Sequence, residues 1–314
     1  MTEGHAKSGR RSVLAALGLV PAALALPGMA WAVDNRVSIS LEGGYRIIRS
    51  NGIPNHETGT FPNRRNPNRI SAQSHEFRVP AMPKAAARPT ALSHGNFGVA
   101  LNGIPFDPFT AEFWNRDRRS GWRYEAMGGR VDLGLDSSNA HVQPNGAYHY
   151  HGLPNGLIRS WSPDRHSGLI GFAADGFPIY ALYGYATGQL GDPVRPMRPG
   201  WRLKRGTRPG GPGGAYDGTF VEDFEFAGGG DLDVNNGRVT RTPDFPDGTY
   251  AYFLTDAFPF IPRSFAGTPD PSFRHGPPGG QGGGMDGSPP PPGGRPPPPG
   301  GPRPPKPPFG FGNG

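Results

Sequence analysis

The stretch Asn139-Ala-His-Val-Gln-Pro-Asn-Gly-Ala-Tyr-His-Tyr-His151 predicts a tight β-hairpin near the middle of the chain. Pro144 suits the first central position of a type I turn, and Gly146 suits the left-handed residue that follows. This combination is typical of a three-residue hairpin loop with a bulge at the glycine. Gln143 is therefore expected to pair with Ala147 across the hairpin.

This register decides which side chains share a face of the hairpin. Counting outward from the turn places His141 opposite His149 and Asn139 opposite His151. Residues two apart on a strand point to the same face, so three imidazoles and one carboxamide converge, with two tyrosines on the other face. A two-residue loop would instead pair His141 with Tyr148 and break up the cluster. The position of the glycine after Pro-Asn favours the first register.

Three imidazoles at this spacing can hold one metal ion. Nitrogen ligands suit Zn, Cu, Ni or Fe better than Ca or Mg, and we expect copper or zinc. His166 is a candidate fourth ligand or proton-transfer group, so the predicted metal ligands are His141, His149, His151 and His166. The alternative is a polar hairpin whose histidines bond to backbone and water and serve the fold.

Other chemistry has no clear motif in this sequence. It contains no Gly-x-Ser-x-Gly elbow, phosphate-binding loop or His-Glu-x-x-His motif, and the absence of cysteine excludes thiol catalysis. Hydrolysis by His166 with Asp175 is a further option, but no nucleophile stands out. These residues leave open whether the protein is an enzyme.

Short apolar or alternating runs on both sides of the hairpin predict further strands. The expected strands are Val37–Leu41, Phe97–Leu101, Trp122–Met127, Thr219–Phe226 and Thr249–Leu254. A second hairpin is expected from Leu169 to Tyr183, with Asp175-Gly176 as its turn. Pro178 suggests an edge position for the second strand of that hairpin. One short helix is expected after Asp107, beginning at Pro108.

These strands, with turn signals between them, predict a mainly β fold with little helix. We expect an antiparallel sandwich or a barrel-like single domain. Long ordered loops are expected over Asn51–Ser74 and Arg202–Gly218. Residues 33–270 are enough for one sizeable core.

The first 32 residues have the features of an export signal. Arg10 and Arg11 precede an apolar run from Val13 to Leu26, and Ala30-Trp31-Ala32 is a small-x-small cleavage pattern. The paired arginines indicate the twin-arginine route, with an ordinary secretory signal as the alternative. The run is too short to span a membrane. We expect a periplasmic or secreted protein with no integral membrane segment in its mature chain.

The opposite end is dominated by proline and glycine. Residues 271–314 hold 16 Pro and 14 Gly, and so few apolar side chains predict a disordered tail that serves as a spacer. Residues 33–270 hold 25 Lys and Arg against 23 Asp and Glu, so most of the net charge of +7 lies at the two ends. We therefore expect no nucleic-acid partner, and a cell-envelope or small-molecule partner is left open.

Several blocks of this sequence resemble the YHYH domain family, named for the tetrapeptide found here at Tyr148-His149-Tyr150-His151. The resemblance covers residues 36–273 and implies an exported protein, with no particular reaction. Its other blocks are Asn51–His56, Gly59–Asn63, Leu101–Pro108, Ala111–Trp114, Ala174–Tyr180 and Thr242–Thr249.

The chain departs from this family at two positions. Relatives often carry cysteine where this chain has Asn235 and Ser264, and both cysteines are missing together. If the two pair in relatives, the resemblance implies that Asn235 and Ser264 are spatial neighbours, with Cα atoms within about 7 Å.

Two functions follow from these observations. The first is a metal-binding exported protein, with or without oxidative chemistry, because the twin-arginine route carries folded proteins that often hold a cofactor already. The second is a structural or adhesive cell-surface module without a metal.

Overall fold

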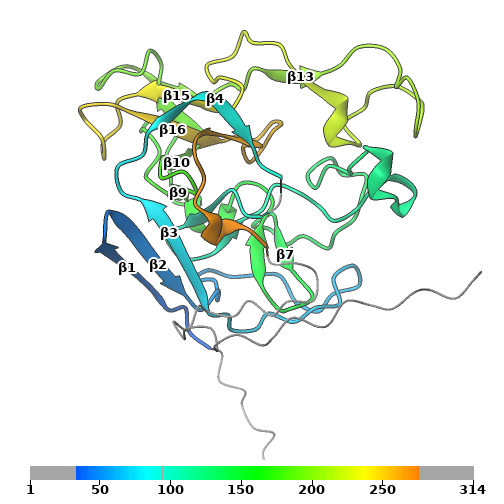
Figure 1. Ribbon diagram of the computed structural model, residues 1–314, viewed down its shortest axis with the longest axis horizontal. Coiled ribbons are helices and arrows are strands. Elements are labelled where there is room, and N and C mark those ends of the chain that lie inside the picture. The colour runs from blue at the N-terminus through cyan, green and yellow to red at the C-terminus, as the bar shows by residue number, and fades with distance from the viewer. Residues whose placement is uncertain (1–32, 94, 276–314) are drawn as a thin grey trace, which may run out of the picture. The chain divides into compact units, whose positions relative to one another are not determined.

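The computed structural model describes residues 33–93 and 95–275, and of these the residues from Asn35 to His275 form one compact unit (Figure 1). The predicted signal peptide lies outside the described residues, as does the predicted tail beyond residue 275. The unit is mainly β with little helix, which confirms the predicted fold class. In the described ranges no helix has the length and apolar character needed to cross a membrane.

An eight-stranded sheet forms the centre of this unit. Its order is β15 (Gly237–Thr240), β16 (Thr249–Leu254), β10 (Pro178–Ala181), β9 (Gly171–Ala173), β5 (Gly98–Ala100), β6 (Pro105–Phe106), β8 (Tyr148–Tyr150) and β7 (Ala140–Val142). The expected barrel does not close, because β15 and β7 are the two edges of this sheet. The sheet is also mixed rather than purely antiparallel, since β10 pairs with β16, and β6 with β8, in parallel.

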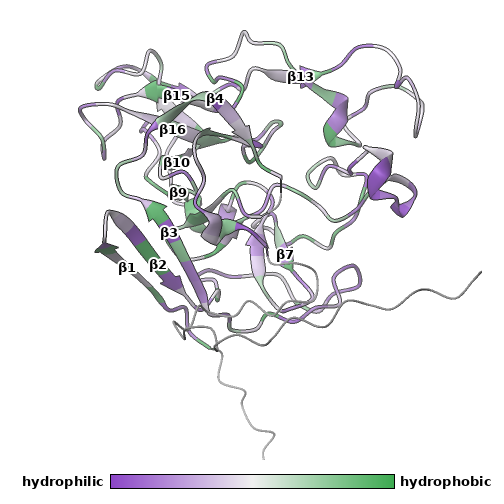
Figure 2. Ribbon diagram, viewed as in Figure 1, coloured by the Kyte–Doolittle hydropathy of each residue, from purple (hydrophilic) through white to green (hydrophobic). Residues whose placement is uncertain are grey.

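A separate antiparallel sheet contains β1, β2 and β3, which lie side by side in Figure 1. Along β3 the buried residues Phe77 and Val79 alternate with Glu76 and Arg78, and Figure 2 shows both hydrophobic and hydrophilic stretches on this strand. One face of β3 therefore packs on the core. The bounds are β1 Val37–Glu42, β2 Tyr45–Ser50 and β3 His75–Pro80.

The remaining strands form two-stranded antiparallel pairs, and the helices are short. The pairs are β4 (Ala85–Ala91) with β17 (Ser264–Gly267), β11 (Tyr183–Tyr185) with β12 (Val194–Pro196), and β13 (Trp201–Leu203) with β14 (Phe224–Phe226). The helices are α1 (Asn155–Ile158) and the single-turn η1 (Trp114–Arg116), η2 (Arg118–Ser120), η3 (Val221–Asp223) and η4 (Pro271–Phe273).

Aromatic rings fill the core between these strands. Phe97 stacks on Phe265 with ring centroids 5.1 Å apart, and Tyr252 meets Phe97 edge-on at 4.9 Å. The Tyr252 hydroxyl donates to Asp175, whose carboxylate also accepts from the backbone N–H of Gly267. Asp175 is therefore a turn residue that ties the second hairpin to β17.

Three local predictions are wrong. No helix follows Asp107, because its carboxylate accepts a hydrogen bond from the N–H of Phe109 and forms an Asx turn. The Trp122–Met127 segment makes only isolated bridges, and only the last three residues of Thr219–Phe226 form a strand, β14, after η3.

The two long loops are found where they were predicted. Asn51–Ser74 and Arg202–Gly218 contain no strand beyond the end of β13.

The second hairpin is confirmed, with Ala173 N–H donating to the carbonyl of Phe177 at 2.9 Å. The edge position predicted from Pro178 is wrong, because β10 lies between β16 and β9. Pro178 is the first residue of its strand, where the sheet tolerates the missing N–H.

The folded unit extends beyond the predicted boundary at Asp270. Phe273 is only 3% exposed, and its ring stacks on Phe77 with centroids 4.8 Å apart. Its carbonyl accepts from the N–H of Asn96 at 2.9 Å. The predicted start of the tail at residue 271 is therefore wrong, because residues 271–275 belong to the domain.

Candidate metal centre

The histidine hairpin has the predicted register. His141 of β7 lies opposite His149 of β8. Gln143 N–H donates to the Ala147 carbonyl at 2.9 Å, and Gly146 has the left-handed φ of 87° expected of the loop. The turn chemistry therefore places the histidines as the sequence predicts.

The imidazoles of His141, His149 and His151 meet at their Nε2 atoms. Nε2 of His151 lies 3.0 Å from Nε2 of His149 and 3.0 Å from Nε2 of His141. One ligand nitrogen from each ring lies within 4.8 Å of the other two. His149 and His151 are buried and His141 is half-buried, so the cluster is largely shielded from solvent.

Main-chain carbonyls fix two of the three rings. Nδ1 of His141 donates to the carbonyl of Leu133 at 2.9 Å, and Nδ1 of His149 donates to the carbonyl of Ala147 at 3.3 Å. A neutral ring with its proton on Nδ1 presents a lone pair at Nε2. Nε2 of His151 lies between these two lone pairs and can donate a proton to only one of them. At least one pair of nitrogens therefore faces each other with no proton between them.

Burial keeps all three rings neutral at pH 7. It lowers the pKa of His149 to about 3, and the neighbouring His141 contributes in the same direction. Burial holds the pKa of His151 well below its usual value, and the neighbouring rings of His149 and His141 add to this effect. Burial also lowers the pKa of His141. Neutral imidazole is the form that binds a metal, so the cluster is already in its ligating state.

The cluster opens into a cavity of about 1120 Å³. Asp107 also lines this cavity; burial raises the pKa of its carboxyl to about 7. The wall of this cavity also carries Phe109, Phe113, Arg118 and Arg123. A ligand in this space can reach the histidine nitrogens.

His166 lies apart from this cluster. Its ring packs against Tyr180 and Tyr185 at centroid distances of 5.1 and 4.8 Å, and its Nδ1 donates to the Ser167 carbonyl. It is absent from the one group of possible metal ligands in the described chain. The carboxamide of Asn139 donates to the carbonyl of Leu153 at 2.8 Å, so it ties the hairpin to the following turn.

The two tyrosines lie on the other face of the hairpin, as predicted. The hydroxyl of Tyr148 donates to Asp136 at 2.7 Å. The hydroxyl of Tyr150 bonds with Nε2 of His56 at 2.7 Å and accepts from the amide of Asn102 at 2.9 Å. His56 therefore supports the hairpin from the face opposite the histidine cluster.

Asn235 and Ser264 are neighbours, as the missing cysteines imply. The Ser264 hydroxyl donates to the side-chain oxygen of Asn235 at 2.5 Å. Sequence reasoning missed the cavity wall at Asp107, Phe109 and Arg123, because no local pattern in the sequence places these residues near the hairpin.

Comparison with known proteins identifies the family and nothing narrower. No curated protein and no solved structure matches the chain significantly. The family model described as YHYH protein matches residues 76–267, which is more than half of the chain and includes the hairpin and every strand of the central sheet. The chain therefore belongs to the YHYH family.

Proposed function

We propose that this protein binds one transition-metal ion, copper or zinc, through Nε2 of His141, His149 and His151. The observation that carries this proposal is the convergence of three buried imidazole nitrogens, two of them with their protons held on Nδ1 by carbonyls. Hydrogen bonds of this kind orient the histidine ligands of metal sites.

The fold alone gives a weaker account of the cluster. Histidines that serve only the fold would alternate donors and acceptors, whereas here one Nε2 lies 3.0 Å from each of two nitrogens that both carry lone pairs. A cation between the three rings removes this mismatch. His166 is left out of the ligand set because its ring is packed against Tyr180 and Tyr185.

The proposed site has three protein ligands and faces a cavity. An ion held by three histidines keeps a coordination position for water or substrate, and such an ion supplies Lewis-acid or redox chemistry. The protein's own residues bury the rings, keep them neutral and hold the ion at the cavity wall. We further propose that the protein is exported by the twin-arginine route, which is compatible with loading the ion before export.

A structural or adhesive role has one specific observation in its favour. Ile39 and Leu41 of β1 are 46% and 75% exposed, although β1 is an edge strand. An exposed apolar edge strand is a common place for another chain to pair. In this alternative the protein holds no metal and the histidines serve the fold.

Elemental analysis tests the metal proposal. The full-length protein is stripped with a chelator, reloaded with Zn²⁺ or Cu²⁺ and freed of excess ion. We expect one ion per chain in the wild type. His149→Ala and His151→Ala should each weaken binding by more than about 100-fold, because loss of a direct ligand exceeds the effect of an outer group.

His166→Ala is the matched control, since it also removes a partly buried imidazole. It should keep one ion per chain with affinity within a few-fold of the wild type. Absence of stoichiometric metal from the reloaded wild type, or equal affinities in all three variants, would contradict the proposal.

A further inference from the structure

Arg123 is a half-buried cation on the wall of the cavity that contains the histidine cluster. Its guanidinium lies 4.4 Å from the ring centroid of Phe109 and 4.8 Å from that of Phe113. Across the residues that the structure describes, it forms no ion pair with a carboxylate. Glu222 and Asp107 attract this guanidinium from beyond ion-pair distance and do not occupy its donors. A partly desolvated guanidinium with open donors is well suited to bind an anion.

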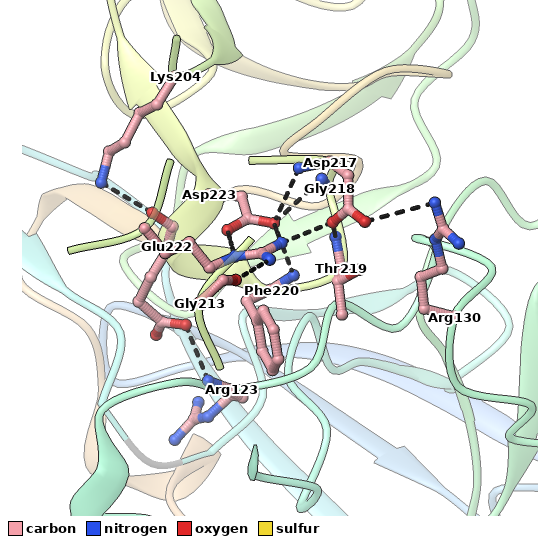
Figure 3. Close-up of polar contacts among 11 residues, drawn as sticks. Arg123, Arg130, Lys204, Gly213, Asp217, Gly218, Thr219, Phe220, Glu222 and Asp223 are labelled. Atoms are coloured by element: carbon pink, nitrogen blue, oxygen red, sulfur yellow. Dashed lines mark hydrogen bonds and ion pairs between the residues drawn. The ribbon is translucent and has the colours of Figure 1, made fainter. Parts of the chain in front are cut away.

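The Glu222 carboxylate attracts the guanidinium electrostatically but forms its hydrogen bond with the main chain of Arg123. Glu222 accepts a hydrogen bond from the backbone N–H of Arg123 at 2.8 Å, and Figure 3 shows the dashed line ending at that nitrogen rather than at the guanidinium. The backbone carbonyl of Arg123 accepts from the N–H of Val221 at 2.9 Å. The main chain of Arg123 is thus held on both sides while its guanidinium remains available.

The segment that holds Arg123 is itself clamped by a buried ion pair. Arg208 bonds both carboxylate oxygens of Asp223, at 2.8 and 2.6 Å, and these side chains are 6% and 0% exposed. The same carboxylate accepts from the N–H groups of Gly218 and Phe220 (Figure 3). A rigid support of this kind fixes a binding side chain in advance of its ligand.

Four basic residues line the cavity against three acidic ones, which are Arg65, Arg118, Arg123 and Arg274 against Asp107, Glu112 and Asp132. Arg65 and Asp132 pair with each other at 3.0 Å and largely cancel. Arg118 lies over Phe113 at 5.6 Å and adds positive charge beside Arg123.

We propose that the cavity binds a small oxyanion, an organic carboxylate or a phosphate, through the guanidinium of Arg123, with the rest of the ligand directed toward the histidine cluster. The placement beside a metal ion rests on the proposed function, whereas the anion site itself stands on Arg123 alone. The ligand class follows from the fork of donors that guanidinium presents to carboxylate and phosphate oxygens.

The first test uses full-length, metal-free protein, so it does not depend on the metal proposal. Sodium benzoate and inorganic phosphate are titrated separately by calorimetry, and the tighter of the two identifies the oxyanion class. Arg123→Gln should weaken that binding roughly 10-fold or more, because it removes charge-assisted hydrogen bonds. Arg123→Lys keeps the charge without the fork and should give an intermediate loss.

Arg205→Gln is the control, because it removes the same charge from an exposed loop position. It should bind both anions like the wild type. Circular dichroism checks that each variant is folded, and if Arg123→Gln is not, the Arg123→Lys comparison decides. Failure of both anions to bind the wild type, or wild-type affinity in both Arg123 variants, overturns the anion site.

The second test places the anion relative to the metal site. In protein loaded with one Cu²⁺, the bound anion should shift the visible absorption band of the copper, and Arg123→Gln should abolish that shift while keeping the copper. An unchanged band in protein that binds both copper and the anion overturns the shared cavity. If no copper is retained but anions still bind through Arg123, the metal proposal fails and the anion site stands.

Discussion

The two walls of this cavity are built in different ways. The histidine wall comes from residues 139–151, and its rings are held by carbonyls at most eight positions away in the sequence. The part of the wall formed by Phe109, Phe113, Arg118 and Arg123, here the arginine wall, is held from behind by contacts over long sequence separations. These contacts join Arg123 to Glu222, 99 residues away, and Glu125 to Arg263, 138 residues away. One wall presents neutral nitrogens, and the other rests on buried charges. Substitutions of the histidines should therefore change metal binding, whereas substitutions of the buried charges that support Arg123 should change the stability of the whole unit.

The largest effect is expected at Asp223, which has no exposed surface. Asp223→Ala leaves the guanidinium of Arg208 buried without its main partner. Removing one member of a buried ion pair costs about 3–5 kcal/mol, and urea unfolding should show that loss. The control is Glu225→Ala, which breaks the exposed pair with Arg202 and should cost less than about 1 kcal/mol. Equal losses would mean that the buried Arg208–Asp223 pair contributes no more to stability than an exposed pair.

Removal of the last turn is expected to have the next largest effect. Truncation after Asp270 deletes Phe273, which is buried against Phe77, and should lower the free energy of unfolding by about 2–3 kcal/mol. Truncation after His275 keeps this contact and should leave the thermal midpoint unchanged, because the following sequence has few apolar side chains to bury. If both truncations leave the midpoint unchanged, Phe273 contributes nothing to the domain.

The same difference in range explains what could be predicted from the sequence. The histidine register follows from the Pro144-Asn145-Gly146 turn, which is local, and the strand Thr249–Leu254 is predicted with its correct bounds. Arg123 gives no local signal, since its role depends on Glu222 and on Phe109.

Two of the errors in the sequence predictions also come from contacts between distant parts of the chain, and one has a local cause. A proline at the start of a strand looks like an edge residue until the neighbouring strands are known, and β10 acquires β16 as a parallel neighbour from residues far along the chain. The predicted helix after Asp107 fails because the Asp107 side chain bonds to the backbone of Phe109. The predicted boundary at Asp270 overlooks Phe273, whose partner Phe77 is distant in the sequence.

Restoring the missing cysteines should stabilise the part of the fold that is held by contacts between distant residues. Asn235 and Ser264 are hydrogen-bonded neighbours, and Ser264 directly follows Arg263. Asn235→Cys with Ser264→Cys should form a disulfide under oxidising conditions. Closing a loop of about 30 residues stabilises by roughly 3 kcal/mol, and loss of the hydrogen bond offsets about 1 kcal/mol. Urea unfolding with and without reductant measures the net gain of about 2 kcal/mol. The prediction would be contradicted if the oxidised double variant were no more stable than its reduced form.

The smallest effect concerns the neutral wall and its response to pH. Burial lowers the pKa of His149 to about 3 in the folded protein, whereas an unfolded histidine titrates near 6.5. The unfolded chain therefore binds a proton that the folded chain does not, and stability falls as pH drops below about 6.5. For His149 alone the loss of stability between pH 7 and pH 5.5 is about 1 kcal/mol.

The variant His149→Gln tests this loss. In metal-free protein it should remove the contribution of His149 to the change of unfolding free energy with pH. The carboxyl of Asp107 has a raised pKa and acts in the opposite direction, but it is present in both proteins and cancels in their difference. Urea unfolding of both proteins at the two pH values measures that difference. Parallel pH dependence in the wild type and the variant would mean that His149 is not buried in its neutral form, and the contrast between a neutral wall and a charged wall would no longer hold.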